Sequence, residues 1–218
     1  LVYRNSQFRN TLFFNRASPI AAFDVTYFNT KNKNLMSYGF ESVNTEMLQN
    51  RIRWSIIKPL VLNNQFSIRF KENISDYFAN RNYYINTLEN ESSLSYQKQA
   101  SYRISALYTF QVSENISGLL NEKAIINKAG VEFRMQNPGK GFMNARFQIQ
   151  FINYPFEKNT PLAFDILQGL QNGTNYLWNQ TWQRSLNSFL QLNLSYNGRK
   201  SPDVKMIHTG QVQLKAFF

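Results

Sequence analysis

The chain ends on the stretch Gly210-Gln211-Val212-Gln213-Leu214-Lys215-Ala216-Phe217-Phe218. One parity of this stretch holds Gly210, Val212, Leu214, Ala216 and Phe218, while the other holds Gln211, Gln213, Lys215 and Phe217. Successive side chains of a β-strand point to opposite faces of its sheet. The alternation therefore predicts a final strand with one apolar face and one mainly polar face.

The same alternation recurs along the chain and predicts about twelve strands in an all-β, antiparallel, up-and-down arrangement. The strands are expected within residues 8–15, 20–28, 36–40, 48–56, 66–70, 83–96, 102–112, 131–135, 143–151, 176–182, 190–196 and 210–218. The polar run from Thr30 to Asn34 is expected to be a turn. A short helix is expected from Pro161 to Leu170, inside the longest connection, Tyr154 to Gly173.

The predicted connections alternate in length. Those near residues 58–64, 97–101, 137–141 and 185–188 are short, and those near 72–82, 113–123, 154–173 and 197–203 are mostly longer. Short turns at one end and long loops at the other are typical of transmembrane β-barrels. The whole chain, residues 1–218, is therefore expected to form one outer-membrane β-barrel domain.

Composition agrees with this interpretation but excludes membrane-spanning helices. No apolar run approaches the roughly 20 residues that a transmembrane helix needs, and the mean hydropathy is −0.44. A barrel strand is half polar, because only every second residue meets lipid. The predicted polar face is rich in Asn, Gln, Ser and Arg, which suits a hydrogen-bonded interior better than a solvated surface. Tyrosines and tryptophans gather toward strand ends, as at membrane interfaces: Tyr83, Tyr84, Tyr102, Tyr154, Tyr176, Trp178, Trp182 and Tyr196.

The terminal stretch resembles the C-terminal signature of bacterial outer-membrane barrels. The resemblance implies that Val212, Leu214, Ala216 and Phe218 form a signal read by the barrel-insertion machinery. More widely, the last 50 or so residues resemble the C-terminal barrel regions of large outer-membrane proteins from the Bacteroidota. The segments that carry this resemblance are Gly169-Leu170-Gln171-Asn172-Gly173 with Trp178, the run Leu190 to Ser201 (LQLNLSYNGRKS), and the run Ile207 to Leu214 (IHTGQVQL). It implies a fold and an outer-membrane location and brings no catalytic residues. The start, Leu1-Val2-Tyr3, looks like interior sequence, so a C-terminal piece of a longer chain is favoured over a mature protein.

The net charge is +11, and many of the basic residues fall on the polar parity of the predicted strands. If that parity lines a lumen, the lumen-facing basic residues are Arg51, Arg53, Arg69, Lys71, Arg103, Arg134, Arg146 and Lys215. A positive wall lowers the energy of passing anions, so an open pore should prefer anions. Alternatively, these side chains pair with loops that fill the lumen or with a missing segment. The basic residues are spread over many strands without a recognition motif, so no nucleic-acid partner is expected.

Few residues point to catalysis or to bound cofactors. His208 is the one histidine, and a Ser-His hydrolase would need a serine such as Ser195 beside it. The chain lacks cysteine and clustered acids, so neither a metal nor a cofactor is expected. The chain is predicted to serve as a pore, a scaffold or a subunit of an envelope transport or assembly complex, in contact with outer-membrane lipid and possible envelope partners. The alternatives are a barrel enzyme acting on lipid and a soluble basic β-barrel that binds other molecules.

Overall fold

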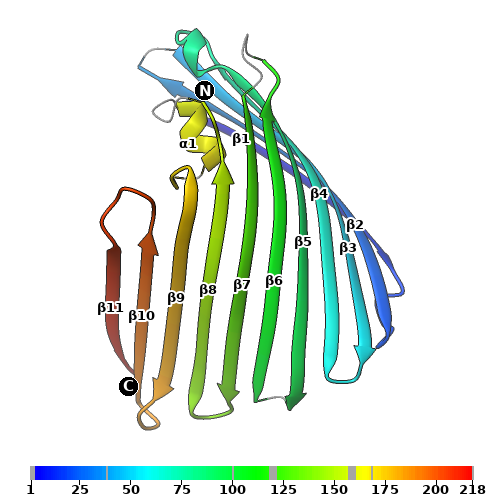
Figure 1. Cartoon of the computed structure of the whole chain (residues 1–218), viewed down its shortest axis with the longest axis vertical. Coiled ribbons are helices and arrows are strands. Elements are labelled where there is room, and N and C mark those ends of the chain that lie inside the picture. Colours follow the sequence, from blue (N-terminus) through cyan, green and yellow to red (C-terminus); the bar gives the residue numbers. More distant parts are fainter. Residues whose placement is uncertain are drawn as a thin grey trace.

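The computed structural model describes residues 3–37, 39–99, 101–117, 122–156, 161–167 and 169–217. Its strands form one 11-stranded antiparallel sheet in which every strand pairs with its neighbours in sequence. The sheet curves strongly, with one short helix on its inner side (Figure 1). The predicted all-β, up-and-down antiparallel fold is confirmed.

The strands in chain order are β1 (Tyr3–Phe14), β2 (Ala21–Met36), β3 (Gly39–Ile57), β4 (Leu60–Ser75), β5 (Tyr83–Gln99), β6 (Tyr102–Asn115), β7 (Lys123–Asn137), β8 (Gly141–Asn153), β9 (Gly173–Ser185), β10 (Leu190–Lys200) and β11 (Ile207–Ala216). A single 3-10 turn, η1 (Ala79–Arg81), precedes β5, and α1 (Pro161–Leu167) precedes β9. The predicted short helix is therefore confirmed, although it ends at Leu167.

The first part of the chain departs from the predicted strand boundaries. The run Thr30 to Asn34 is not a turn but part of the second half of β2. Of the strand expected over residues 36–40, the described residues belong to two strands, Met36 to β2 and residues 39–40 to β3. Backbone pairing with β1 and β3 continues through the polar run, and the Asn29 amide donates to Glu46 Oε1 at 3.0 Å. Because ladder hydrogen bonds do not depend on side-chain polarity, a polar run can extend a strand into water.

The connections alternate in length along the sheet, as predicted. Residues 15–20, 58–59, 100–101, 138–140 and 186–189 join strands at one end, called here the short-loop end. Residues 37–38, 76–82, 116–122, 154–172 and 201–206 join them at the other, the long-loop end. The connection 37–38 departs from this pattern, because Met36 of β2 pairs with Gly39 of β3 and only two residues separate the strands. The connection 15–20 departs from it too, being as long as 201–206.

The two faces of the sheet are defined by α1. The helix lies between β8 and β9 in the chain, yet its Asp165 accepts a hydrogen bond and ion pair from Lys71 of β4. Strands so far apart in the sheet reach the same helix only because the sheet curls around it. We call the face that carries Lys71 and α1 the inner face and the opposite one the outer face.

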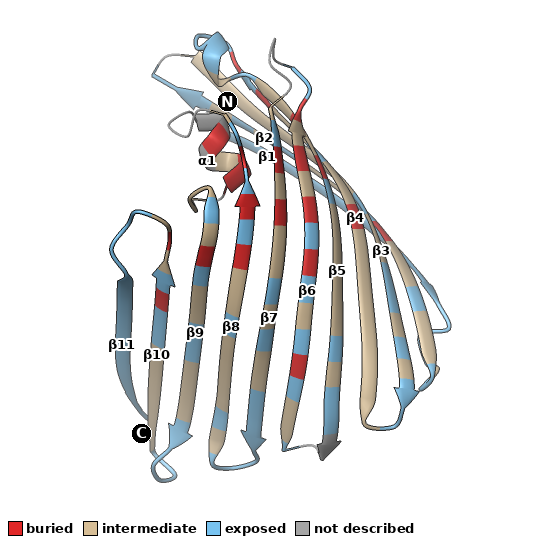
Figure 2. Cartoon of the chain, in the orientation of Figure 1, coloured by how far each residue is buried: buried red, intermediate tan, exposed pale blue. Residues whose placement is uncertain are grey.

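Side chains are distributed over these faces in the reverse of a soluble protein. The buried polar residues, including Thr26, Ser67, Gln111 and Asn175, share the register rows of the inner face. Large apolar side chains of the outer face are exposed, Trp54 by 49% and Phe147 by 41%. Figure 2 shows most of the buried positions in the upper part of the central strands, toward α1, with a further buried position lower on β6. The outer apolar side chains do not pack into a shielded centre.

The described apolar core is small and lies at the long-loop end of the inner face. Ala163, Ile166 and Leu167 of α1 pack with a group from the sheet and the following connection: Ile85, Ala124, Ile126, Ile152 and Tyr154. Burial raises the pKa of the Tyr154 phenol to about 12, and the carboxylate of Glu122 acts in the same direction. This cluster fixes α1 against the wall.

The sheet has two edges, β1 and β11, and no pairing joins them among the described residues. β1 runs from the long-loop end at Tyr3 to the short-loop end at Phe14. β11 runs the same way, from Ile207 to Ala216. The two edge strands therefore point in the same direction, as an odd number of up-and-down strands requires.

A close contact on the outer face ties three strands together near the β11 edge. The indole of Trp178 in β9 lies over Gly198 of β10, where an added Cβ would come within 2.1 Å of the Trp178 Cε2 atom. The same indole lies 5.8 Å from the ring of His208 in β11, centroid to centroid. Glycine is needed here because the indole occupies the space of its missing side chain.

This contact predicts that Gly198→Ala destabilises the sheet, by about 1–3 kcal/mol as for other overpacked sites. Equilibrium unfolding by denaturant measures the change. Gly210→Ala is the matched control, because Gly210 also lies on the outer face near β10 and its added Cβ would meet no atom within 4 Å. The double variant Trp178→Ala/Gly198→Ala should lose less than the two single changes combined. Equal effects at Gly198 and Gly210 would contradict this account.

Candidate functional site: the basic inner face

The basic residues singled out from the sequence all project from one side of the sheet. Their strands are β3, β4, β6, β7, β8 and β11, and the pairing registers place every one on the inner face. They are Arg51, Arg53, Arg69, Lys71, Arg103, Arg134, Arg146 and Lys215. The structure does not bring them into one cluster but distributes them along the wall.

In β2 to β7 several inner basic residues are neutralised by acids. Arg51 faces Asp24 at 3.6 Å, and Lys128 faces Glu89 at 3.8 Å. Arg53 instead donates to the Ser18 carbonyl oxygen at 2.7 Å. The acids lie on strands of the sheet and not in lumen-filling loops or a missing segment, whereas Asp165, the partner of Lys71, lies on α1 in the longest connection.

Glu132 of β7 is surrounded by more positive charge than it can balance. Its Oε1 lies 3.7 Å from Nη2 of Arg103 and 3.7 Å from Nη2 of Arg134. Arg146 of β8 stands directly opposite Glu132 in the register but forms no ion pair or hydrogen bond among the described residues. The buried Nε of Arg146 is unsatisfied. Two guanidinium groups thus share one carboxylate, and the third, that of Arg146, has no ion-pair partner in the described ranges.

The last four strands are basic without compensation. β8, β9, β10 and β11 contain no aspartate or glutamate at all. Their inner face carries Arg146, Arg199 and Lys215. Acids therefore offset part of the positive charge on the inner face of β2 to β7, whereas β8 to β11 carry basic residues without any acid of their own.

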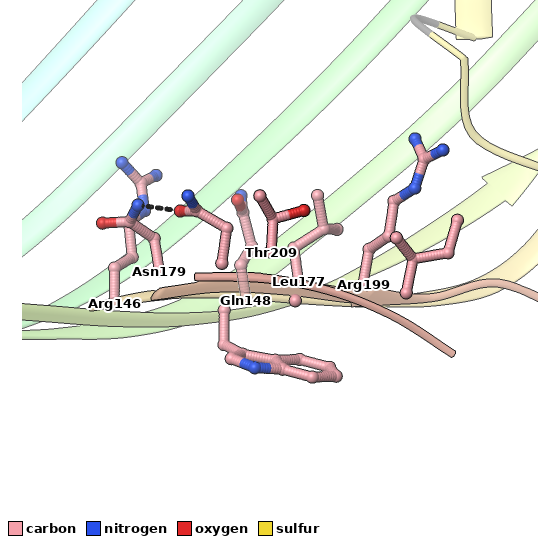
Figure 3. Close-up of a pocket in the computed structure, with 10 residues that line it drawn as sticks. Arg146, Gln148, Leu177, Asn179, Arg199 and Thr209 are labelled. Atoms are coloured by element: carbon pink, nitrogen blue, oxygen red, sulfur yellow. Dashed lines mark hydrogen bonds between the residues drawn. The ribbon is translucent and has the colours of Figure 1, made fainter. Parts of the chain in front are cut away.

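A pocket of about 560 Å³ opens on this positive part of the wall. Two rows of side chains from β8 to β11 form its floor. The first row is Arg146, Asn179, Asn197 and Thr209, and the second is Gln148, Leu177, Arg199 and Ile207. Figure 3 shows the labelled side chains rising from the same side of the sheet, with the Asn179 amide donating to the Asn197 carbonyl oxygen.

The sequence pattern missed three inner basic residues, which are Arg9 of β1, Lys128 of β7 and Arg199 of β10. Arg199 lies on the same face of β10 as Gln191, Asn193, Ser195 and Asn197. A predicted strand longer than 190–196 would have included it. Lys128 lies in the first half of β7, which begins at Lys123 rather than at 131. The alternation there is broken by Ala129 and Gly130.

Three residues of the expected insertion signal lie on the outer face of β11. Val212 is 72% exposed and Leu214 is 60% exposed, and Ala216 has the same parity. Phe218 lies outside the described residues. The described part of the signal is thus an apolar edge surface.

The residues considered for catalysis do not meet. His208 lies on the outer face, where its Nδ1 is 2.7 Å from the Tyr196 hydroxyl, whereas Ser195 lies on the inner face. Within the described ranges no group of three or more metal-binding side chains is present. No helix in the described part of the chain is long and apolar enough to cross a membrane.

Comparison with known proteins gives similarities to solved structures only. No family model matches the chain, and no curated protein sequence matches it. Among solved structures, the chain is similar to the translocator domain of the autotransporter NalP from Neisseria meningitidis, with 11% identity and a TM-score of 0.45. The match covers 99% of this chain and 80% of that chain. Similarity at this level assigns neither a family nor a function.

Proposed function

We propose that this chain forms the wall of a bacterial outer-membrane β-barrel, with its outer face in lipid and its inner face lining a polar, anion-preferring pore. The observation that carries the proposal is the exposure of the outer apolar side chains beside a polar, hydrogen-bonded inner face. In water, an exposed apolar surface of this extent would be an aggregation site. In a bilayer, it is the surface that lipid requires.

The outer apolar band has a boundary that fits a bilayer. On β2 it contains Phe23, Val25 and Tyr27, and it gives way to Asn29, Lys31 and Lys33 toward the long-loop end. β3 has 19 residues, far more than the roughly 9–11 that cross the apolar layer. The polar upper parts of β2 and β3 would stand in water beyond the membrane.

One cluster of polar side chains inside the band is satisfied by its own hydrogen bonds. On β4 and β5 the Asn64 amide donates to Asn90 Oδ1 at 2.8 Å and to Ser92 Oγ at 2.9 Å. A satisfied amide cluster costs less in lipid than unpaired amides would. These residues are compatible with a lipid-facing surface.

The inner face has the character of an aqueous lining. Hydroxyl and amide ladders cross it, such as Ser95 with Ser105 at 2.8 Å and Lys128 with Gln111 at 2.9 Å. The excess of positive charge on β8 to β11 would stabilise passing anions. The helix α1 would narrow the lumen at the long-loop end without covering that basic region.

The proposal also covers the source of the chain and the proteins that it contacts. The C-terminal segments quoted above favour an envelope protein of the Bacteroidota. The outer apolar row Val212, Leu214 and Ala216, with Phe218, would be read by the barrel-insertion machinery. Other envelope proteins are its expected partners, with a scaffold or complex subunit as the alternative to a pore.

Substitutions at two adjacent residues of β10 test which face of the sheet meets lipid. Leu194→Lys places a charge on the outer face between Trp182 and Val212, and Ser195→Lys places the same charge on the inner face. We expect Leu194→Lys to cost about 2–4 kcal/mol if it lies at the bilayer centre, and Ser195→Lys to cost far less. Unfolding in lipid vesicles and heat-dependent gel migration report the loss. A tolerated Leu194→Lys with a protein that stays in solution without detergent would contradict the membrane assignment.

A second test concerns ion preference. Under a KCl gradient across a planar bilayer, the reversal potential should have the sign of chloride selectivity, because the β8–β11 wall is positive and carries no acid. High ionic strength should weaken the preference by screening. Reversal potentials that favour potassium would remove the anion preference while leaving the barrel itself intact. A protein that inserts and conducts no ions would favour the scaffold alternative.

A further inference from the structure

We propose that the pocket on β8 to β11 is a binding site for an organic anion, in which Arg146 and Arg199 hold a phosphate, sulfonate or carboxylate group and Leu177 and Ile207 contact its apolar body. The site lies in one wall of the sheet and needs neither membrane insertion nor an open lumen. It therefore goes beyond the proposed pore.

The first step is the free positive charge. Arg146 and Arg199 form no ion pair or hydrogen bond within the described part of the chain, whereas Arg51, Arg103 and Arg134 each form an ion pair. Glu132, which faces Arg146 in the register, is already shared by Arg103 and Arg134. The buried Nε of Arg146 is an unsatisfied donor that no nearby protein oxygen fills. Guanidinium donors bind phosphate and carboxylate oxygens in pairs, which suits an oxyanion at this position.

The second step is the arrangement of the two arginines. They lie diagonally across the floor, two strands apart, with Arg146 in the first row on β8 and Arg199 in the second row on β10. From the spacing of strands and of residues along a strand, their Cα atoms are about 12 Å apart. Side chains of that length can converge on one group between them or hold two ends of an elongated anion.

The third step is the surface between them. Asn179, Asn197 and Thr209 supply amide and hydroxyl groups beside Arg146, while Leu177 and Ile207 flank Arg199 with apolar surface. A small inorganic ion would use only the first of these surfaces. A ligand with both an anionic group and an apolar body would use both, and the pocket volume of about 560 Å³ is of the size that holds small organic molecules.

The local backbone supports the pocket from behind. Gly198 lies between Asn197 and Arg199 and faces outward, where Trp178 covers it. Its lack of a side chain lets the indole pack flat on β10, opposite the pocket floor. The floor is thus braced by the outer contact already described.

Phenyl phosphate is the probe for a test by isothermal titration calorimetry of the purified protein at low ionic strength. Its phosphate matches the arginines, and its ring matches Leu177 and Ile207. Inorganic phosphate and phenol are the two half-probes, one without the apolar body and one without the charge. We expect phenyl phosphate to bind more tightly than either.

Arg146→Gln and Arg199→Gln should each weaken phenyl phosphate binding by about tenfold or more, since each removes charge-assisted hydrogen bonds. Arg184→Gln is the matched control: it removes the same charge from β9, but Arg184 lies on the outer face near Trp182. It should leave binding within about twofold. Leu177→Ala should weaken phenyl phosphate but not inorganic phosphate.

Three results would overturn the proposal. Equal losses in Arg146→Gln and Arg184→Gln would mean that the whole charge of the chain, and not this pocket, attracts the probe. Equal affinity for phenyl phosphate and inorganic phosphate would remove the apolar half of the site. No saturable binding by the unaltered protein would remove the site altogether. Thermal unfolding of each variant, measured in parallel, separates lost binding from lost fold, and none of these results depends on ion conduction.

Discussion

The structure depends on one constraint: the registers of all ten strand pairs place the polar parity of every strand on the same face. A slip by one residue in any pair would turn that strand's apolar set inward and its polar set outward. Hydrogen bonds between side chains hold the register on the inner face, as between Thr87 and Ser113 at 3.1 Å. Close packing holds it on the outer face, where Trp178 fills the space that a side chain at position 198 would need. The two faces thus remain distinct across the whole sheet.

This separation of faces also explains the charge distribution. An inner wall of polar side chains can hold many arginines because each lies beside amides, hydroxyls or acids rather than in an apolar core. Acids accompany the arginines from β2 to β7, with Glu132 shared by Arg103 and Arg134. They are missing from β8 to β11, so the positive charge of Arg146 and Arg199 is left for other anions. The asymmetry arises from which strands carry acids and not from the overall charge of the chain.

Alternation in the sequence was enough to predict the fold and the common face of the eight basic residues, since parity alone decides which way a strand side chain points. The prediction failed where the sequence does not alternate between apolar and polar residues. The run Thr30 to Asn34 is polar on both parities and looks like a turn, yet backbone pairing extends β2 through it. Arg199 was missed because β10 continues past Tyr196, where Gly198 interrupts the apolar parity. The pocket could not be predicted from the sequence. Each of its two rows takes one residue from each of β8 to β11, and alternation does not tell which residues of neighbouring strands lie opposite one another.

The direction of the edge strands limits how this sheet can form a ring. All ten existing pairs are antiparallel, whereas β1 and β11 both run from the long-loop end to the short-loop end. If β1 and β11 paired directly, they would form a parallel pair. A closed barrel in which every pair is antiparallel needs an odd number of further strands between β11 and β1. A second copy in the same membrane orientation would present edges of the same direction and could not supply that pairing. Unpaired backbone N–H and C=O groups are costly in lipid. If the outer face lies in the bilayer, the backbone groups of β1 and β11 must therefore be paired as well.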